Sequence, residues 1–150
     1  MAMVVVLNTT PERAFRVMTH YTALGKINSA VQQSQLLKTF SPLKHRVKTV
    51  TSVCVLWVCQ TITQIQDMLK NPRTLHLQAT LTENNPDFIS GYASWHFSAH
   101  PKGTKMTFDS MIEPAFWIPP LIGPWAVSNM LTSQADITSV GLEREASKLP

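Results

Sequence analysis

Charged residues are scarce in this chain. They make up 15% of its 150 residues, against about a quarter in an ordinary soluble domain, while hydrophobic residues make up 44%. Much of the surface must therefore be neutral or apolar. Two interpretations stay open: the protein handles something hydrophobic, or its surface is simply rich in Thr, Ser and Gln.

Long hydrophobic runs and basic clusters are missing as well. No stretch reaches the ~18 apolar residues that are needed to span a bilayer. The 13 Lys and Arg residues are scattered and leave a formal net charge of +4, so no tract indicates nucleic-acid binding. We expect no nucleic-acid partner, although a weak attraction to anionic lipid head groups or RNA stays open.

The first seven residues do not resemble an export signal. They have no basic n-region, and their apolar run is too short. If the natural protein is exported, its signal has been removed, so this end of the chain does not identify the compartment.

Motifs of catalysis and cofactor binding are also lacking. No phosphate loop, nucleophile elbow or metal-ligand cluster occurs, so we predict no cofactor and no metal site. His76 and His96 are out of phase with the apolar faces of their strands, which favours surface positions. Most of the nine carboxylates fall where solvent is expected. The carboxylates that could lie nearer the interior are Asp67, Asp109, Glu113 and Asp136. We assign no catalytic residue.

Hydrophobic periodicity predicts a single α+β domain over residues 1–150. Alternation of apolar and polar residues, clearest from Leu75 to Leu81, predicts an antiparallel sheet of about seven strands. Thr10 and Pro11 indicate the start of a first helix. The strands are expected at residues 4–7, 31–40, 45–53, 59–68, 75–81, 89–99 and 105–113. The helices are expected at 11–20, 22–27 and 124–147.

This order of elements predicts an apolar pocket. A meander of strands curls because sheets twist, and one long helix laid across the concave face does not fill it. The inward faces combine small and large residues, and small residues leave volume. The small ones are Thr49, Thr51, Gly91, Ala93 and Ser110, and the large ones are Trp95, Phe97, Met106 and Phe108. The alternative is that the aromatic side chains pack against the helix without a void.

Three segments resemble a known superfamily. They are Asn8 to Leu24, Gly91 to Phe97 with the hairpin Gly103 to Phe108, and Glu113 to Pro124. Their order and spacing are similar to those of START-like, Bet-v-type helix-grip (SRPBCC) domains, in the polyketide cyclase/dehydrase and coenzyme-Q-binding branch. The resemblance implies a curved sheet of about seven strands wrapped around a long C-terminal helix, with two short helices after the first strand. It also implies binding of lipids, quinones, polyketides or plant hormones.

The resemblance further implies that three loops gather at one end of the pocket. These are residues 55–58, 84–88 and 114–124, and two of them are unusually apolar for turns. Such loops form either a hydrophobic mouth that admits a ligand or touches a membrane, or a plug that folds into the pocket. The expected ligand-binding residues of cavity and mouth are Leu56, Trp57, Trp95, Phe97, Met106, Phe108, Phe116, Trp117, Ile118, Leu121, Ile122, Trp125, Met130 and Ile137.

Cys54 and Cys59 flank the first of these apolar loops. Across a hairpin with four intervening residues they can sit opposite one another and form a disulfide, which would indicate an oxidising compartment and export. The alternative is two buried free thiols in a reduced cytosol. Two cysteines without a nearby histidine do not complete a tetrahedral metal site.

The sequence therefore favours binding or transport of a hydrophobic small molecule or lipid, such as an isoprenoid quinone or polyketide. The first alternative is a cyclase, dehydratase or hydrolase that uses the same cavity. The second is a protein- or ribosome-binding module. Neither the ligand nor the oligomeric state is specified by the sequence.

Overall fold

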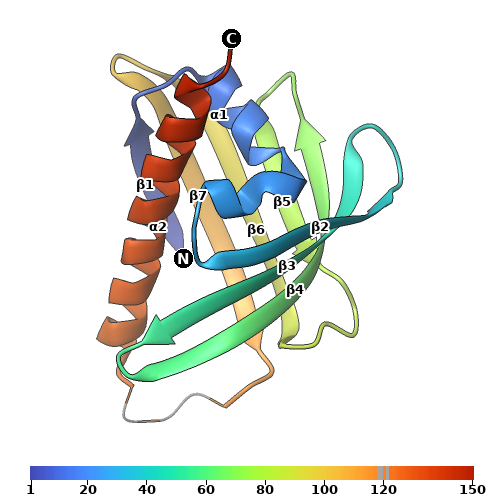
Figure 1. Cartoon of the computed structure of the whole chain (residues 1–150), viewed down its shortest axis with the longest axis vertical. Coiled ribbons are helices and arrows are strands. Elements are labelled where there is room, and N and C mark those ends of the chain that lie inside the picture. Colours follow the sequence, from blue (N-terminus) through green and yellow to red (C-terminus); the bar gives the residue numbers. More distant parts are fainter. Residues whose placement is uncertain (118–119, 121) are drawn as a thin grey trace.

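The computed structural model describes residues 1–117, 120 and 122–150. Within them lie a seven-stranded antiparallel sheet, two short helices after the first strand and a long C-terminal helix (Figure 1), so the predicted α+β helix-grip fold is confirmed. The elements are β1 (Ala2–Leu7), α1 (Pro11–Met18), the 3₁₀ helix η1 (Tyr21–Lys26), β2 (Val31–Thr39), β3 (Lys44–Val55), β4 (Val58–Asn71), β5 (His76–Leu81), β6 (Phe88–His100), β7 (Gly103–Pro114) and α2 (Pro124–Ser147).

Local chemistry determines the ends of α1. The Thr10 hydroxyl accepts a hydrogen bond from the backbone N–H of Arg13 at 3.3 Å, as an N-cap residue does, and Pro11 occupies the first turn. The helix ends at Met18, two residues before the predicted end at His20. The reason is Thr19, whose hydroxyl donates to the Phe15 carbonyl at 2.9 Å and whose backbone leaves the helical region.

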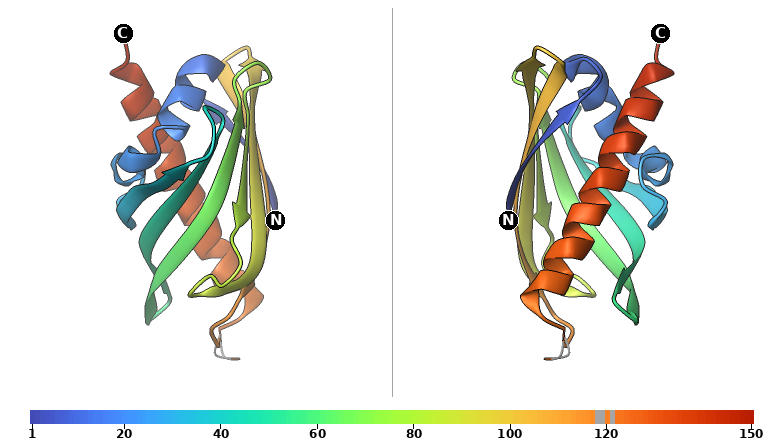
Figure 2. Two further views of the ribbon diagram at one scale, coloured as in Figure 1. Left: turned by 90° about the vertical axis from the view of Figure 1, so that its right-hand side faces the viewer. Right: turned by 90° about the vertical axis from the view of Figure 1, so that its left-hand side faces the viewer.

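The sheet order is β1-β7-β6-β5-β4-β3-β2. Strands β3 and β4 are longer than predicted, because Val55 still pairs with Val58 and only Leu56 and Trp57 remain as the turn. Figure 2 shows that the sheet curves strongly and that α2 runs obliquely across its concave side. Helix α2 contacts α1, β1 and β3.

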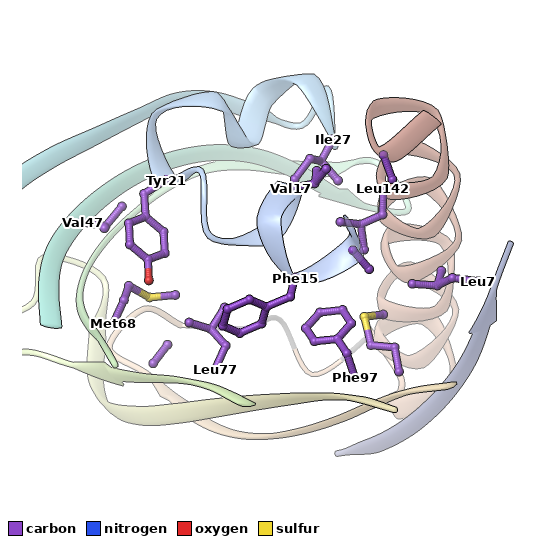
Figure 3. Close-up of a cluster of buried hydrophobic side chains, with 14 residues drawn as sticks. Leu7, Phe15, Val17, Tyr21, Ile27, Val47, Met68, Leu77, Phe97 and Leu142 are labelled. Atoms are coloured by element: carbon purple, nitrogen blue, oxygen red, sulfur yellow. The ribbon is translucent and has the colours of Figure 1, made fainter. Parts of the chain in front are cut away.

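The hydrophobic core lies at one end of this arrangement, under α1 and the C-terminal half of α2 (Figure 3). Phe15 of α1 meets Phe97 of β6 edge to face, with ring centroids 6.1 Å apart. Phe97 is only 1% exposed, and Leu7 and Leu142 are fully buried. The main cluster of buried hydrophobic side chains therefore lies at the end of the sheet that α1 covers.

Helix α2 comes very close to Ile27, the residue after η1, at Gly141. A Cβ atom added there would lie 1.8 Å from the Ile27 carbonyl oxygen, so only glycine permits this contact. Gly141, Leu142 and Ala146 are all buried.

Among the described residues, no helix has the length and hydropathy needed to cross a membrane.

We expect Gly141→Ala to lower the free energy of unfolding by about 1–3 kcal/mol, the usual cost of overpacking, although Ala is the better helix former by about 1 kcal/mol. Urea unfolding followed by circular dichroism measures this. Ser133→Ala, on an exposed position of the same helix, is the matched control and should change stability by less than about 0.5 kcal/mol. A Gly141→Ala variant as stable as the wild type would contradict the close contact.

Candidate functional site

A cavity of about 620 Å³ lies between the N-terminal half of α2 and the strands β3, β4 and β7. Its volume is within the range of small-molecule sites. Its lining residues lie at the opposite end of α2 from the core. Figure 1 shows the turn between β3 and β4 near the first turns of α2 at this end. The described residues that line it are Met1, Thr51, Val53, Val55, Val58, Gln60, Ile62, Gln64, Phe88, Ser110, Met111, Ile112, Pro114, Phe116, Trp117, Ile122, Val127, Met130, Leu131 and Gln134.

The strand wall follows from the alternation of side chains. On β3 every second residue from Thr51 to Val55 lines the cavity, and on β4 every second residue from Val58 to Gln64 does so. The two sets face each other in register, with Val53 opposite Gln60. Because alternate residues of a strand point to one face, this hairpin presents a single continuous surface to the cavity.

The helix wall follows from helical periodicity. Val127, Met130, Leu131 and Gln134 line the cavity, which is the i, i+3, i+4, i+7 spacing of one helix face. Helix α2 begins at Pro124, so these residues belong to its first three turns. The same helix thus encloses the cavity with its first half and completes the core with its second half.

Part of the predicted site lies at the cavity. Phe116, Trp117, Ile122 and Met130 line it, and Phe116 meets Phe88 edge to face with ring centroids 6.0 Å apart. Ile118 and Leu121 fall outside the described residues.

Four predicted cavity residues lie elsewhere, although they do face the concave side. Phe97 and Met106 are core residues, and Trp95 packs against that core. Phe108 stacks on Trp95 with ring centroids 5.2 Å apart. These positions were predicted wrongly because strand phase specifies the face of a sheet, whereas position along the strand decides between core and cavity.

The small residues of the concave face do not all leave space. Thr51 and Ser110 line the cavity as predicted. A Cβ on Gly91, by contrast, would be 2.7 Å from a methyl group of Leu81. Ala93 packs against the core. Open volume therefore remains only where no large neighbour reaches over the small residue.

The remaining predicted residues are exposed and are not among the lining residues. Trp57 is 76% exposed, Trp125 62%, Leu56 47% and Ile137 40%. Trp117, which does line the cavity, is itself 75% exposed. Leu56, Trp57, Trp117 and Trp125 all belong to the β3–β4 turn or to the entry into α2, so we call them the apolar rim.

The polar part of the lining was not predicted from the sequence. Gln60, Gln64 and Gln134 each line the cavity, but glutamine usually indicates solvent exposure. Strand periodicity was the available signal. Gln60 and Gln64 lie on the same face of β4 as Val58 and Ile62.

Among the described lining residues, none has a carboxylate, imidazole, ammonium or guanidinium side chain. The carboxylates singled out from the sequence lie elsewhere: Asp109, Glu113 and Asp136 are exposed. Asp67 accepts two hydrogen bonds from Arg46, at 2.8 and 3.1 Å. No group of three or more potential metal ligands occurs in the part of the chain that the structure describes.

The groups whose pKa values the fold shifts lie away from the cavity. Burial raises the pKa of Tyr21 to about 12. Burial, and then the nearby Lys70, lower the pKa of His45. The hydrogen bond from Arg46 lowers the pKa of Asp67. Shifted pKa values often cluster at catalytic sites, and here they do not coincide with the cavity.

Cys54 and Cys59 form a disulfide. The two residues are directly opposite one another on β3 and β4 and are exposed. They alternate with Val53, Val55 and Val58, which line the cavity, so the bridge lies on the outer face of the hairpin. It links the two strands one residue pair away from the turn that carries Leu56 and Trp57.

The family model for polyketide cyclase/dehydrase and lipid transport proteins matches residues 1–143. The chain belongs to this family. The resemblance to START-like proteins is thereby confirmed. A search of curated protein sequences finds no match.

Several solved structures share the fold of this polyketide cyclase/dehydrase family member, although their sequences differ greatly from it. A protein of Thermus thermophilus is 16% identical with a TM-score of 0.80, over 97% of this chain and 95% of that chain. The aromatase/cyclase Zhui of a Streptomyces species is 11% identical with a TM-score of 0.76, over 99% and 93%. A START superfamily protein of Mycobacterium smegmatis is 14% identical with a TM-score of 0.75, over 100% and 98%. At identities this low, the similarity establishes the shared fold alone.

In this family member the disulfide should stabilise the cavity wall. We expect reduction to lower the free energy of unfolding by about 2 kcal/mol, the value that the chain-entropy model gives for so short a loop. Urea unfolding with and without tris(carboxyethyl)phosphine measures the difference. A Cys54→Ser/Cys59→Ser variant should show the same loss and no response to the reductant. Equal stability of the oxidised and reduced wild type would contradict the expectation.

Proposed function

We propose that residues 1–150 form one domain that binds and carries an apolar small molecule, such as a lipid, isoprenoid quinone or polyketide, in the cavity under α2. The observation that carries this proposal is the cavity of about 620 Å³ with a mainly aliphatic and aromatic lining. Burial of apolar ligand surface in such a site is the principal source of affinity.

The character of the polar groups supports binding over catalysis. The polar side chains of the lining belong to Thr51, Gln60, Gln64, Ser110 and Gln134, which are hydroxyls and amides. A cyclase or dehydratase that works by acid–base chemistry needs a titratable group within reach of its substrate. Hydroxyls and amides orient a ligand but do not ionise near neutral pH.

The apolar rim supports exchange of the ligand at a membrane. Trp57, Trp117 and Trp125 are each more than 60% exposed, and Trp117 also lines the cavity. Tryptophan is favoured at the interface between water and lipid because its ring is amphipathic. A rim that enters the interface would allow an apolar ligand to pass between bilayer and cavity without crossing water.

The uncharged fluorescent probe phenylnaphthylamine tests the binding proposal. Met130→Trp should fill part of the cavity and weaken probe binding by more than about tenfold, or about 1.4 kcal/mol. Val140→Trp, at an exposed position of the same helix, is the matched control and should bind as the wild type does. Absence of binding to the wild type, or equal binding by the two variants, would contradict the proposal.

Flotation with phosphatidylcholine vesicles tests the membrane contact. Trp57→Ser should reduce the bound fraction, with a partition coefficient roughly tenfold lower, because a large apolar side chain no longer enters the interface. Val140→Ser removes an exposed apolar side chain far from the rim and should leave binding unchanged. If neither the wild type nor the Trp57→Ser variant associates with vesicles, the rim has another role.

A further inference from the structure

The polar and apolar residues of the cavity are separated along its length. Val55, Val58 and Trp117 lie near the rim. Gln64 is six residues, or about 20 Å of strand, from Val58, and it pairs with the buried Thr49. Gln134 lies at the end of the third turn of α2, about 15 Å from Pro124. The inner end of the cavity is therefore polar, and the remainder is mostly apolar, with Thr51, Gln60 and Ser110 as its polar side chains.

A chain of hydrogen bonds orients the amide of Gln134. The backbone N–H of Ala30 donates to Oδ1 of Asn28 at 2.8 Å. The Asn28 Nδ2 group donates to Oε1 of Gln134 at 2.9 Å and to the Thr138 hydroxyl at 3.0 Å. A backbone N–H can act only as a donor, so it determines which side of the Asn28 amide carries the oxygen. The Asn28 amide in turn determines the orientation of the Gln134 amide.

This orientation leaves the Nε2 group of Gln134 for the cavity. The Oε1 atom is already bonded to Asn28, and in the described part of the chain no acceptor for Nε2 is found. A donor that loses water on ligand binding must find an acceptor, or the complex is destabilised. The inner end of the cavity thus presents an oriented hydrogen-bond donor.

We propose that the ligand is an uncharged amphipathic molecule whose inner end has a hydrogen-bond-accepting oxygen, of the ketone, quinone or ester class, bound by Nε2 of Gln134. This inference rests on the proposed function and specifies its ligand class. The apolar part of the ligand extends along Ile62, Met130 and Val127 toward the rim. Asn28 is a positioning residue, because it determines which Gln134 atom faces the ligand.

The described lining has no Lys, Arg or His side chain, and its ammonium group, the N-terminus of Met1, donates a hydrogen bond to the Ser110 carbonyl on β7. A carboxylate beside Gln134 on α2 would lose its hydration without a cationic side chain to compensate its charge. A single neutral amide donor is sufficient for a carbonyl oxygen. The site therefore discriminates a ketone or ester from the anion of a fatty acid.

Three tricyclic compounds of one shape test the donor. Fluorenone has an acceptor oxygen, carbazole has a donor N–H, and fluorene has neither. Their dissociation constants are measured by displacement of phenylnaphthylamine at pH 8. The wild type should bind fluorenone roughly three- to tenfold more tightly than fluorene, the effect of one net hydrogen bond, and should not prefer carbazole.

Two variants then assign the preference to Gln134 and Asn28. Gln134→Leu should bind all three compounds with similar affinity. Asn28→Asp should invert the preference toward carbazole, because an ionised carboxylate accepts from Nε2 and turns Oε1 of Gln134 to the cavity. Gln60→Leu, nearer the rim, is the control and should keep the preference for fluorenone. Circular dichroism checks that each variant is folded, and Gln134→Leu decides the question if Asn28→Asp does not fold.

The outcomes separate this inference from the proposed function. If the wild type binds fluorene but shows no preference for fluorenone, or if Gln134→Leu keeps that preference, the inference is overturned and the cavity remains a ligand site. If none of the three compounds binds, the proposed function and the inference are both overturned.

Discussion

The close contact between Gly141 of α2 and the carbonyl of Ile27 is the constraint on which the other features depend. With no room for a Cβ at that point, the C-terminal half of the helix is held against the residue that follows η1. A straight helix held at one end above a strongly curved sheet cannot follow the sheet along its whole length. The cavity under Val127, Met130 and Leu131 is the space that results. Its position thus follows from the location of Gly141 near the C-terminal end of α2.

The contact between Gly141 and Ile27 lies next to the residues that orient the proposed hydrogen-bond donor. Asn28 is adjacent to Ile27, and it binds Gln134 and Thr138, which are four residues apart on one face of α2. A helix that shifted by one turn relative to η1 would lose the glycine contact and both hydrogen bonds together. The position of the donor at the inner end of the cavity is therefore specified by the contact that also closes the core. Such coupling favours a single register of the helix.

The sequence predicts features that depend on neighbouring residues and misses those that depend on tertiary distance. Alternation from Leu75 to Leu81 and the Thr10–Pro11 start of α1 are local signals, and the corresponding elements are present. The distinction between Phe97 in the core and Ile112 at the cavity is not local, because both face the concave side. It depends on where α1 and α2 cover the sheet. Only the structure supplies that information.

The polar lining illustrates a second limit. Gln60 and Gln64 lie at positions of β4 that alternate toward the concave face. Glutamine usually indicates solvent exposure, so the residue type was given more weight than the position. The apolar character of the loops was read from their residues, but their gathering at one end was expected only from the resemblance to START-like proteins. Of the predicted mouth, Phe116, Trp117 and Ile122 line the cavity, while Trp57 and Trp125 project into solvent. The family pattern indicated the correct end of the molecule but not the direction of each side chain.

The turn between β3 and β4 has a composition that the stability of the fold does not require. Leu56 has a φ of 55°, a conformation that glycine or asparagine adopts in hairpin turns and that costs other residues about 1–2 kcal/mol. Trp57 beside it leaves most of its surface in water. A turn selected for stability would contain neither residue, and the disulfide next to it links the two strands that display them. Unfavourable backbone geometry combined with exposed apolar surface is typical of a functional contact. These features support the proposal that the turn is the part of the rim that meets an apolar surface outside the protein, at the end where the cavity lies.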